Sequence, residues 1–132
     1  MPSVRSRRFW ILVSGIITVS IGIVHITNTP QIYRQSLRAF SNEAARARGA
    51  AYFFALAGVL VLYAGLSLVF ASLQLRGSEV CARWVIVGAS IVVLMVGGGA
   101  WGVGLKNPLI WLLLALGPAN IILLFGDRWR RP

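Results

Sequence analysis

The chain has 132 residues, of which 58% are hydrophobic and 12% charged, and its mean hydropathy is +0.78. Soluble domains carry about a quarter charged residues, so this composition excludes an ordinary soluble domain and is typical of a membrane protein. The net charge of +10 comes from basic residues that flank the apolar segments. Lipid phosphates are the expected partners of such residues, so we expect no nucleic-acid partner.

Four long segments are almost free of charge, and they cover residues 9–28, 50–73, 84–105 and 109–125. A bilayer core of about 30 Å needs about 17–25 helical residues, so each segment can span it. Too few residues remain for a second domain. The sequence therefore predicts one all-α integral membrane domain over residues 1–132. Its four transmembrane helices should form an up-down bundle because the connections are short.

The tryptophans give independent support for these four spans. An indole ring prefers the interface between water and hydrocarbon, so tryptophan is enriched at the ends of membrane helices. Each tryptophan of the chain falls within about a turn of a segment end. They are Trp10, Trp84, Trp101, Trp111 and Trp129.

The first segment contains the only histidine, His25, just before the sequence TNTP. Ser14, Thr18, His25 and Asn28 lie within about 80° of arc on a helix, and such a polar stripe should face other helices. His25 is therefore the candidate cofactor-binding residue, for a haem or pigment metal, a quinone or a lipid headgroup. The alternative is an interfacial histidine that donates to a backbone carbonyl. Pro30 should end this helix.

The first loop is the long one, and in it Ile32, Leu37 and Phe40 alternate with Arg34 and Arg38. This pattern predicts a short interfacial amphipathic segment between the first and second helices. Its apolar side should face the membrane, and its two arginines should bind lipid headgroups.

The residues that follow predict an early start of the second helix. Ser41 is the expected N-cap, with Glu43 in the first turn and Arg46 three residues further on as its ion-pair partner. The alanine-rich sequence should carry this helix a few turns beyond the membrane. In the middle of the span, the hydroxyl of Tyr63 needs a partner.

The third span contains Gly97, Gly98, Gly99 and Gly102. Such small residues let helix backbones approach closely in lipid, and this is one interpretation of the sequence. The other is an unwound stretch that lines a ligand site, as in the broken helices of transporters.

The fourth span contains Pro118, which should kink the helix, and Asn120, an amide in the middle of a span. The amide should bond another helix or the carbonyl that Pro118 frees. Our hypothesis for a site is a small polar pocket built from His25, Tyr63, Gly97–Gly99 and Asn120.

Chemistry-bearing residues are few. The only acids are Glu43, Glu79 and Asp127, all outside the spans, and no span contains lysine or arginine. This argues against a proton-coupled antiporter, which usually keeps a carboxylate in the membrane. No metal-ligand cluster or catalytic set is present in the pattern, so we expect no metal site and no catalytic residue, and the sequence favours a protein that is not an enzyme over an enzyme that works with very few groups.

The basic residues predict the orientation. Eight lie at the termini and in the second loop, against five in the first and third loops. The positive-inside rule then places both termini in the cytoplasm and the chain in the cell membrane as a multi-pass protein.

Three functions stay open. The first is a non-catalytic membrane subunit that packs against partner membrane proteins, because small-residue faces on several helices exceed what one bundle can pack. The second is a homo-oligomer of identical copies that transports uncharged or anionic cargo. The third is a cofactor-, quinone- or lipid-binding protein centred on His25.

Overall fold

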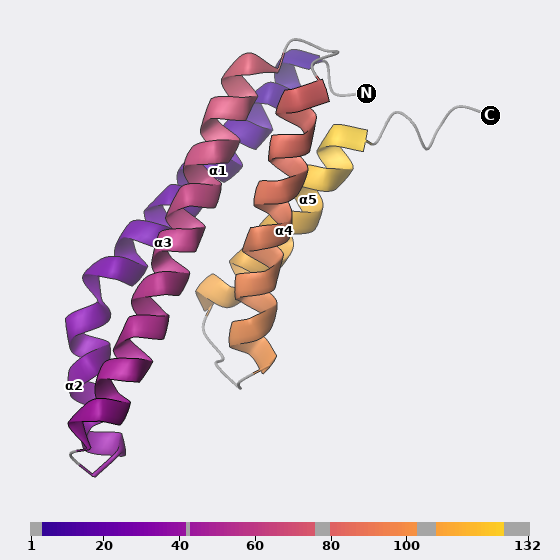
Figure 1. Ribbon diagram of the computed structural model, residues 1–132. Helices are drawn as coiled ribbons and strands as arrows, with labels where there is room; N and C mark the ends of the chain where they lie inside the picture. The colour runs from indigo at the N-terminus through magenta and orange to yellow at the C-terminus, as the bar shows by residue number, and fades with distance from the viewer. Residues whose placement is uncertain (1–3, 42, 76–79, 103–107, 126–132) are drawn as a thin grey trace.

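The computed structural model describes residues 4–41, 43–75, 80–102 and 108–125, and this part of the chain is all-helical. Four of its helices are long and apolar enough to cross a membrane, which confirms the four predicted segments. A fifth, shorter helix connects the first two along the chain and lies at their lower end in Figure 1. In chain order the helices are α1 (Val4–Thr27), α2 (Thr29–Ala39), α3 (Ala44–Gln74), α4 (Val80–Gly102) and α5 (Pro108–Phe125).

The helices begin earlier than the apolar segments do. Arginine and alanine favour a helix, but the arginines exclude these first turns from segments that were chosen to be free of charge. Thus α3 begins six residues ahead of the segment predicted from residue 50. The last residues of the predicted third span, 103–105, lie outside the described residues.

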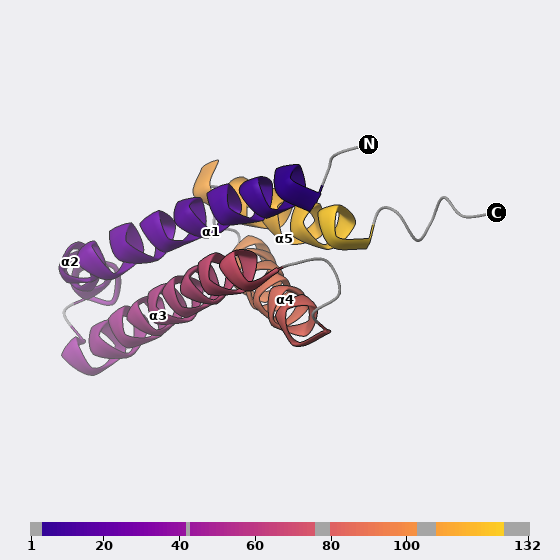
Figure 2. The ribbon, with the colours of Figure 1, turned by 90° about the horizontal axis from the view of Figure 1, so that it is seen from above.

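The long helices form two pairs, α1 with α3 and α4 with α5 (Figure 1). The pairs are joined because α3 packs on α4 and because α1 meets α5. Seen from above, the first turns of α1 and the last turns of α5 lie at the same end of the molecule (Figure 2).

Glycines bring the backbones of α1 and α3 into direct contact. A Cβ added at Gly22 would lie 2.6 Å from the backbone nitrogen of Leu62, and one added at Gly65 would lie 2.6 Å from that of Val19. No real Cβ fits at these distances, so any larger residue would force the helices apart. The small-residue faces of the first two predicted spans therefore pack against each other inside the chain.

On α3 the buried side chains are mostly small, while several exposed ones are large. Phe53, Tyr63 and Phe70 of α3 are 70%, 70% and 62% exposed. A surface so rich in large apolar groups is unfavourable in water and suits hydrocarbon. The buried face of α3 is mostly alanine, glycine and serine, and it consists of Ala47, Ala51, Gly58, Val61, Ala64, Gly65, Leu68, Ala71 and Ser72.

The α4–α5 pair is also built on glycine. A Cβ added at Gly117 of α5 would lie 3.0 Å from the carbonyl oxygen of Ser90, and one at Gly97 would lie 3.3 Å from Cβ of Leu113. Pro118 directly follows Gly117, inside α5, which continues to Phe125.

An arginine ties the start of α1 to the end of α3. The guanidinium of Arg8 donates from Nε to the carbonyl oxygen of Ser72 at 3.2 Å and from Nη2 to that of Leu73 at 2.9 Å. These carbonyls belong to the last turn of α3, where no helical N–H remains to donate to them. The positive charge of Arg8 also suits the negative end of the helix dipole.

The amphipathic segment is helical, but it packs differently from the expectation. Pro30 ends α1 and lies in the first turn of α2, where its missing N–H is tolerated. The half-buried residues of α2 include Ile32, Tyr33 and Leu37, and this helix packs against α3. Its apolar side therefore faces the first turns of α3 in the structure, where we had expected it to face the membrane.

The prediction of Ser41 as the N-cap of the next helix is wrong. Ser41 has φ 51° and donates from its N–H to the carbonyl oxygen of Arg38 at 3.3 Å. This left-handed conformation ends α2, so Ser41 belongs to the preceding helix and Glu43 is the cap position of α3. The predicted ion pair is confirmed, with Arg46 Nε 2.9 Å from Glu43 Oε2.

Gly65→Ala tests the backbone contact between α1 and α3. The added methyl group overpacks the seam, so we expect a loss of about 1–3 kcal/mol in the free energy of unfolding. The measurement is denaturant unfolding in detergent micelles. Gly88→Ala is the matched control, because no atom in the described part of the chain lies within 4 Å of a Cβ there. Equal stability of the two variants would contradict this packing.

Candidate functional site

The structure does not bring the residues of the predicted polar pocket together. Tyr63 is 70% exposed on the outside of α3, while Asn120 is 1% exposed. A Cβ added at Gly98 or Gly99 would meet no atom of the described residues within 4 Å, so these glycines do not face any of the described helices. Of the predicted glycine run, Gly97 packs against α5.

His25 lies at the far end of the α1–α3 seam. Its ring stacks on that of Phe54, with ring centroids 3.7 Å apart and an angle of 16° between the planes. Across the same seam, its Cβ lies 3.2 Å from where a Cβ on Gly58 would stand. Within the described residues, no group of three or more His, Cys, Asp or Glu side chains could hold a metal ion. Cofactor binding by His25 stays a prediction.

A buried hydrogen bond joins α1 to α5. Nδ2 of Asn120 donates to Oγ of Ser14 at 2.9 Å, and both residues are buried. On α1 the neighbouring Thr18 donates from Oγ1 to the carbonyl oxygen of Ser14 at 2.8 Å. The two buried members of the predicted polar stripe thus face protein, while Asn28 at its end is exposed.

The amide of Asn120 is only half satisfied. Oδ1 is buried and has no hydrogen-bond partner among the described residues. A buried polar atom without a partner costs about 1–3 kcal/mol. In a hydrocarbon environment, no water is present to reduce that cost.

This amide lies at a cleft of about 490 Å³ between α1 and α5, which we call the α1–α5 cleft. Apart from Ser14, Asn120 and the indole N–H of Trp10, the side chains that line it are apolar. The full lining is Trp10, Val13, Ser14, Ile17, Leu116, Ala119, Asn120, Ile122 and Leu123.

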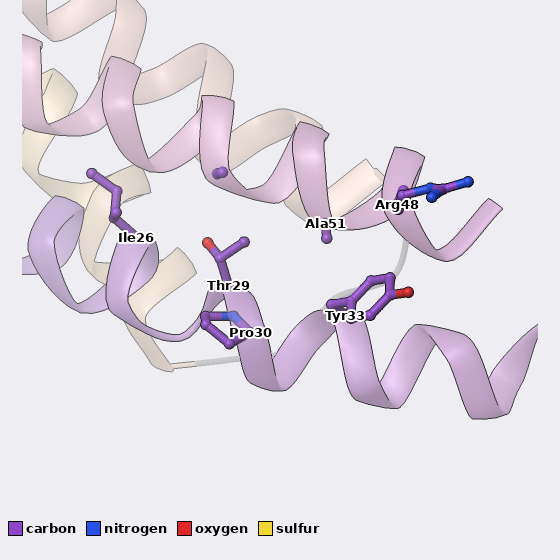
Figure 3. Close-up of a pocket in the computed structure, with 7 residues that line it drawn as sticks. Ile26, Thr29, Pro30, Tyr33, Arg48 and Ala51 are labelled. Atoms are coloured by element: carbon purple, nitrogen blue, oxygen red, sulfur yellow. The ribbon is translucent and has the colours of Figure 1, made fainter. Parts of the chain in front are cut away.

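A second hollow, of about 550 Å³, lies where α1 and α2 run beside α3 (Figure 3). Figure 3 shows Tyr33 and Arg48 toward the same end, on facing helices. It is lined by Ile26, Thr29, Pro30, Tyr33, Arg48, Ala51 and Ala55.

Arg34 and Arg38, predicted to bind lipid headgroups, are exposed on α2 and do not line this hollow. Sequence reasoning counted Arg48 with the first loop for the charge rule and placed it in the helical extension of the second span, but it gave Arg48 no role at this hollow. The signal was the spacing of Ala47, Ala51 and Ala55, four residues apart, which marks a helix face that another helix can approach.

One face of α4 is open. Trp84, Ile91 and Met95 are 69%, 46% and 71% exposed, and four glycines lie on the same face, within about 100° of arc. Among the described residues, a Cβ added at any of these glycines would meet no atom within 4 Å. We call this the α4 glycine face, and its glycines are Gly88, Gly98, Gly99 and Gly102.

The described residues therefore define an all-helical protein with four helices of membrane-spanning length, a half-satisfied amide between two of them and an open glycine face on a third. Comparison of the chain with protein-family models, with curated proteins and with solved structures finds no match.

Ser14→Ala tests the bond between α1 and α5. The variant leaves both ends of the Asn120 amide without a partner, so we expect the free energy of unfolding in lipid-free micelles to fall by about 1–3 kcal/mol. Adding Asn120→Val should restore it to within about 0.5 kcal/mol, because no buried polar group then remains unpaired. If the double variant is less stable than Ser14→Ala alone, this account of the bond is wrong.

Proposed function

We propose that this protein is a non-catalytic subunit of a larger membrane complex, inserted in the cell membrane as a four-span up-down bundle. The outward-facing large apolar side chains support insertion, since they would be costly in water. The exposed tryptophans near helix ends, such as Trp10, Trp84 and Trp111, suit the two interfaces of a bilayer.

The observation that carries the proposal is the α4 glycine face. Glycine in a helix costs about 1 kcal/mol relative to alanine. A glycine that allows no close helix contact therefore weakens its helix with no compensating gain. Gly22, Gly65 and Gly117 have a use, because each allows a close contact within the chain. The glycines of the α4 glycine face have none among the described residues. A helix of a partner subunit, approaching closely as small residues permit in lipid, gives them one.

The test is the pair of substitutions Gly98→Ile and Gly102→Ile, with native mass spectrometry of protein extracted gently from its own membrane. We expect the wild type to carry foreign subunits in fixed stoichiometry. The double variant should lose them at least about tenfold, a change of about 1.4 kcal/mol in binding.

The matched control is Ala115→Ile, which adds the same side chain to an exposed position of α5 and should keep the partner. A wild-type particle of identical copies with nothing attached would contradict the subunit proposal. It would support the alternative, a homo-oligomeric transporter of uncharged or anionic cargo.

The proposed topology has both termini in the cytoplasm. The charge count includes several residues outside the described ones, namely Arg76, Lys106 and the C-terminal arginines. Of the described ones, Arg5, Arg7 and Arg8 lie at one end of the long helices, with Arg83 near the start of α4. The described arginines are equally numerous at the opposite end, where Arg34, Arg38, Arg46 and Arg48 lie, so the proposed orientation depends on the sequence count of eight basic residues against five.

Cys81 provides the measurement, because it is the only cysteine of the chain and is exposed in the first turn of α4. In intact cells, a membrane-impermeant maleimide should leave it unmodified until the membrane is permeabilised. The control is Gln35→Cys in a Cys81→Ser background, at an exposed position of α2. It should react in intact cells, and the reverse pattern would overturn the topology.

A further inference from the structure

The α1–α5 cleft contains a hydrogen-bond acceptor that the described part of the protein leaves unpaired. Oδ1 of Asn120 has no partner, while Nδ2 of the same amide is held by Ser14 at 2.9 Å. The side chain is therefore fixed at one end and unsatisfied at the other. A group that donates to Oδ1 would complete it.

Water is a poor candidate for this donor. A buried water makes about three hydrogen bonds, whereas Ser14 and Asn120 already bond each other and the other lining residues are apolar except for the indole N–H of Trp10. Ser14 also lies six residues beyond Arg8, about 9 Å further along the helix at about 1.5 Å per residue. In the proposed membrane orientation this depth is within the hydrocarbon, where water is scarce.

A helix of a partner protein is a poor fit as well. A helix with its side chains is about 10–12 Å across, so only one of its side chains could enter the cleft. The cleft volume of about 490 Å³ instead falls within the range of about 300–1,000 Å³ that is typical of small-molecule sites. Such sites are mostly apolar with a few placed polar groups, which describes this lining.

We propose that the α1–α5 cleft binds an uncharged, mostly hydrocarbon molecule of the bilayer through one hydroxyl group, which donates to Oδ1 of Asn120. The hydrocarbon part lies along the apolar walls, next to side chains such as Ile17 and Leu116. The site uses α1 and α5 and does not involve the α4 glycine face, so it is independent of the proposed subunit role.

The test compares two probes that differ in one hydrogen-bond donor, 1-dodecanol with a diazirine on its chain and the methyl ether of the same molecule. The purified full-length protein in lipid nanodiscs is irradiated at a series of probe concentrations, and labelled peptides are mapped by mass spectrometry. We expect saturable labelling of residues 10–17 and 116–123. The ether should need about two- to tenfold higher concentration, as expected for the loss of one neutral hydrogen bond.

Variants locate the effect in the cleft. Asn120→Val should bring the alcohol and the ether to within about twofold of each other, because neither finds an acceptor there. Ala119→Trp fills the cleft and should reduce saturable labelling by the alcohol at least about fivefold. Ala115→Trp, on the same helix but outside the cleft lining, should change neither.

The wild-type comparison alone decides the proposal if the Asn120 variant fails to fold. Equal labelling by the alcohol and the ether in the wild-type protein would overturn it, and the cleft would then be a groove filled by ordinary lipid chains. Saturable labelling only outside the two segments, or a foreign helix cross-linked to them in protein taken from its own membrane, would also overturn it.

Discussion

The contact between the backbones of α1 and α3 determines how the rest of the chain is arranged. In hydrocarbon no hydrophobic force joins two apolar helices, so their association depends on van der Waals contact at close range. Gly22 and Gly65 allow the two backbones to approach this closely because neither has a side chain to separate the helices. Arg8 then fixes the register by bonding the last carbonyls of α3. The resulting pair is a stiff unit along which α2 and α4 pack.

The attachment of α5 to this unit is weaker and depends on polar groups. Gly117 places α5 tightly on α4, but the contact of α5 with α1 is much less extensive than that of α3 with α1. There the Asn120–Ser14 bond replaces the extended packing that glycines give to α1 and α3. A seam closed by one hydrogen bond leaves space beside it, and that space is the α1–α5 cleft. The cleft and the half-satisfied amide therefore have a common cause.

The sequence predicted the helices well and their neighbours poorly. A run of about 20 apolar residues needs no tertiary contacts to be recognised as a span. A helix that is apolar all round, however, has no polar face to indicate how it is rotated about its axis. This is why Tyr63 was expected inside and lies outside, and why Asn120 was grouped with the wrong residues. The N-cap prediction was wrong at Ser41 because this residue lies between the end of α2 and the start of α3, and its left-handed conformation ends α2.

Small and polar residues therefore carry most of the functional information in the described helices. A leucine or valine facing lipid can be exchanged for many others at little cost, whereas a glycine or a buried amide is unfavourable unless something compensates it. Gly22, Gly65 and Gly117 are compensated within the chain. The α4 glycine face and Oδ1 of Asn120 are not compensated by any described residue. They differ in chemistry, since one offers close approach to a helix and the other a hydrogen bond within a small cleft. One occupant cannot satisfy both, and for this reason we assign them a protein partner and a small molecule respectively.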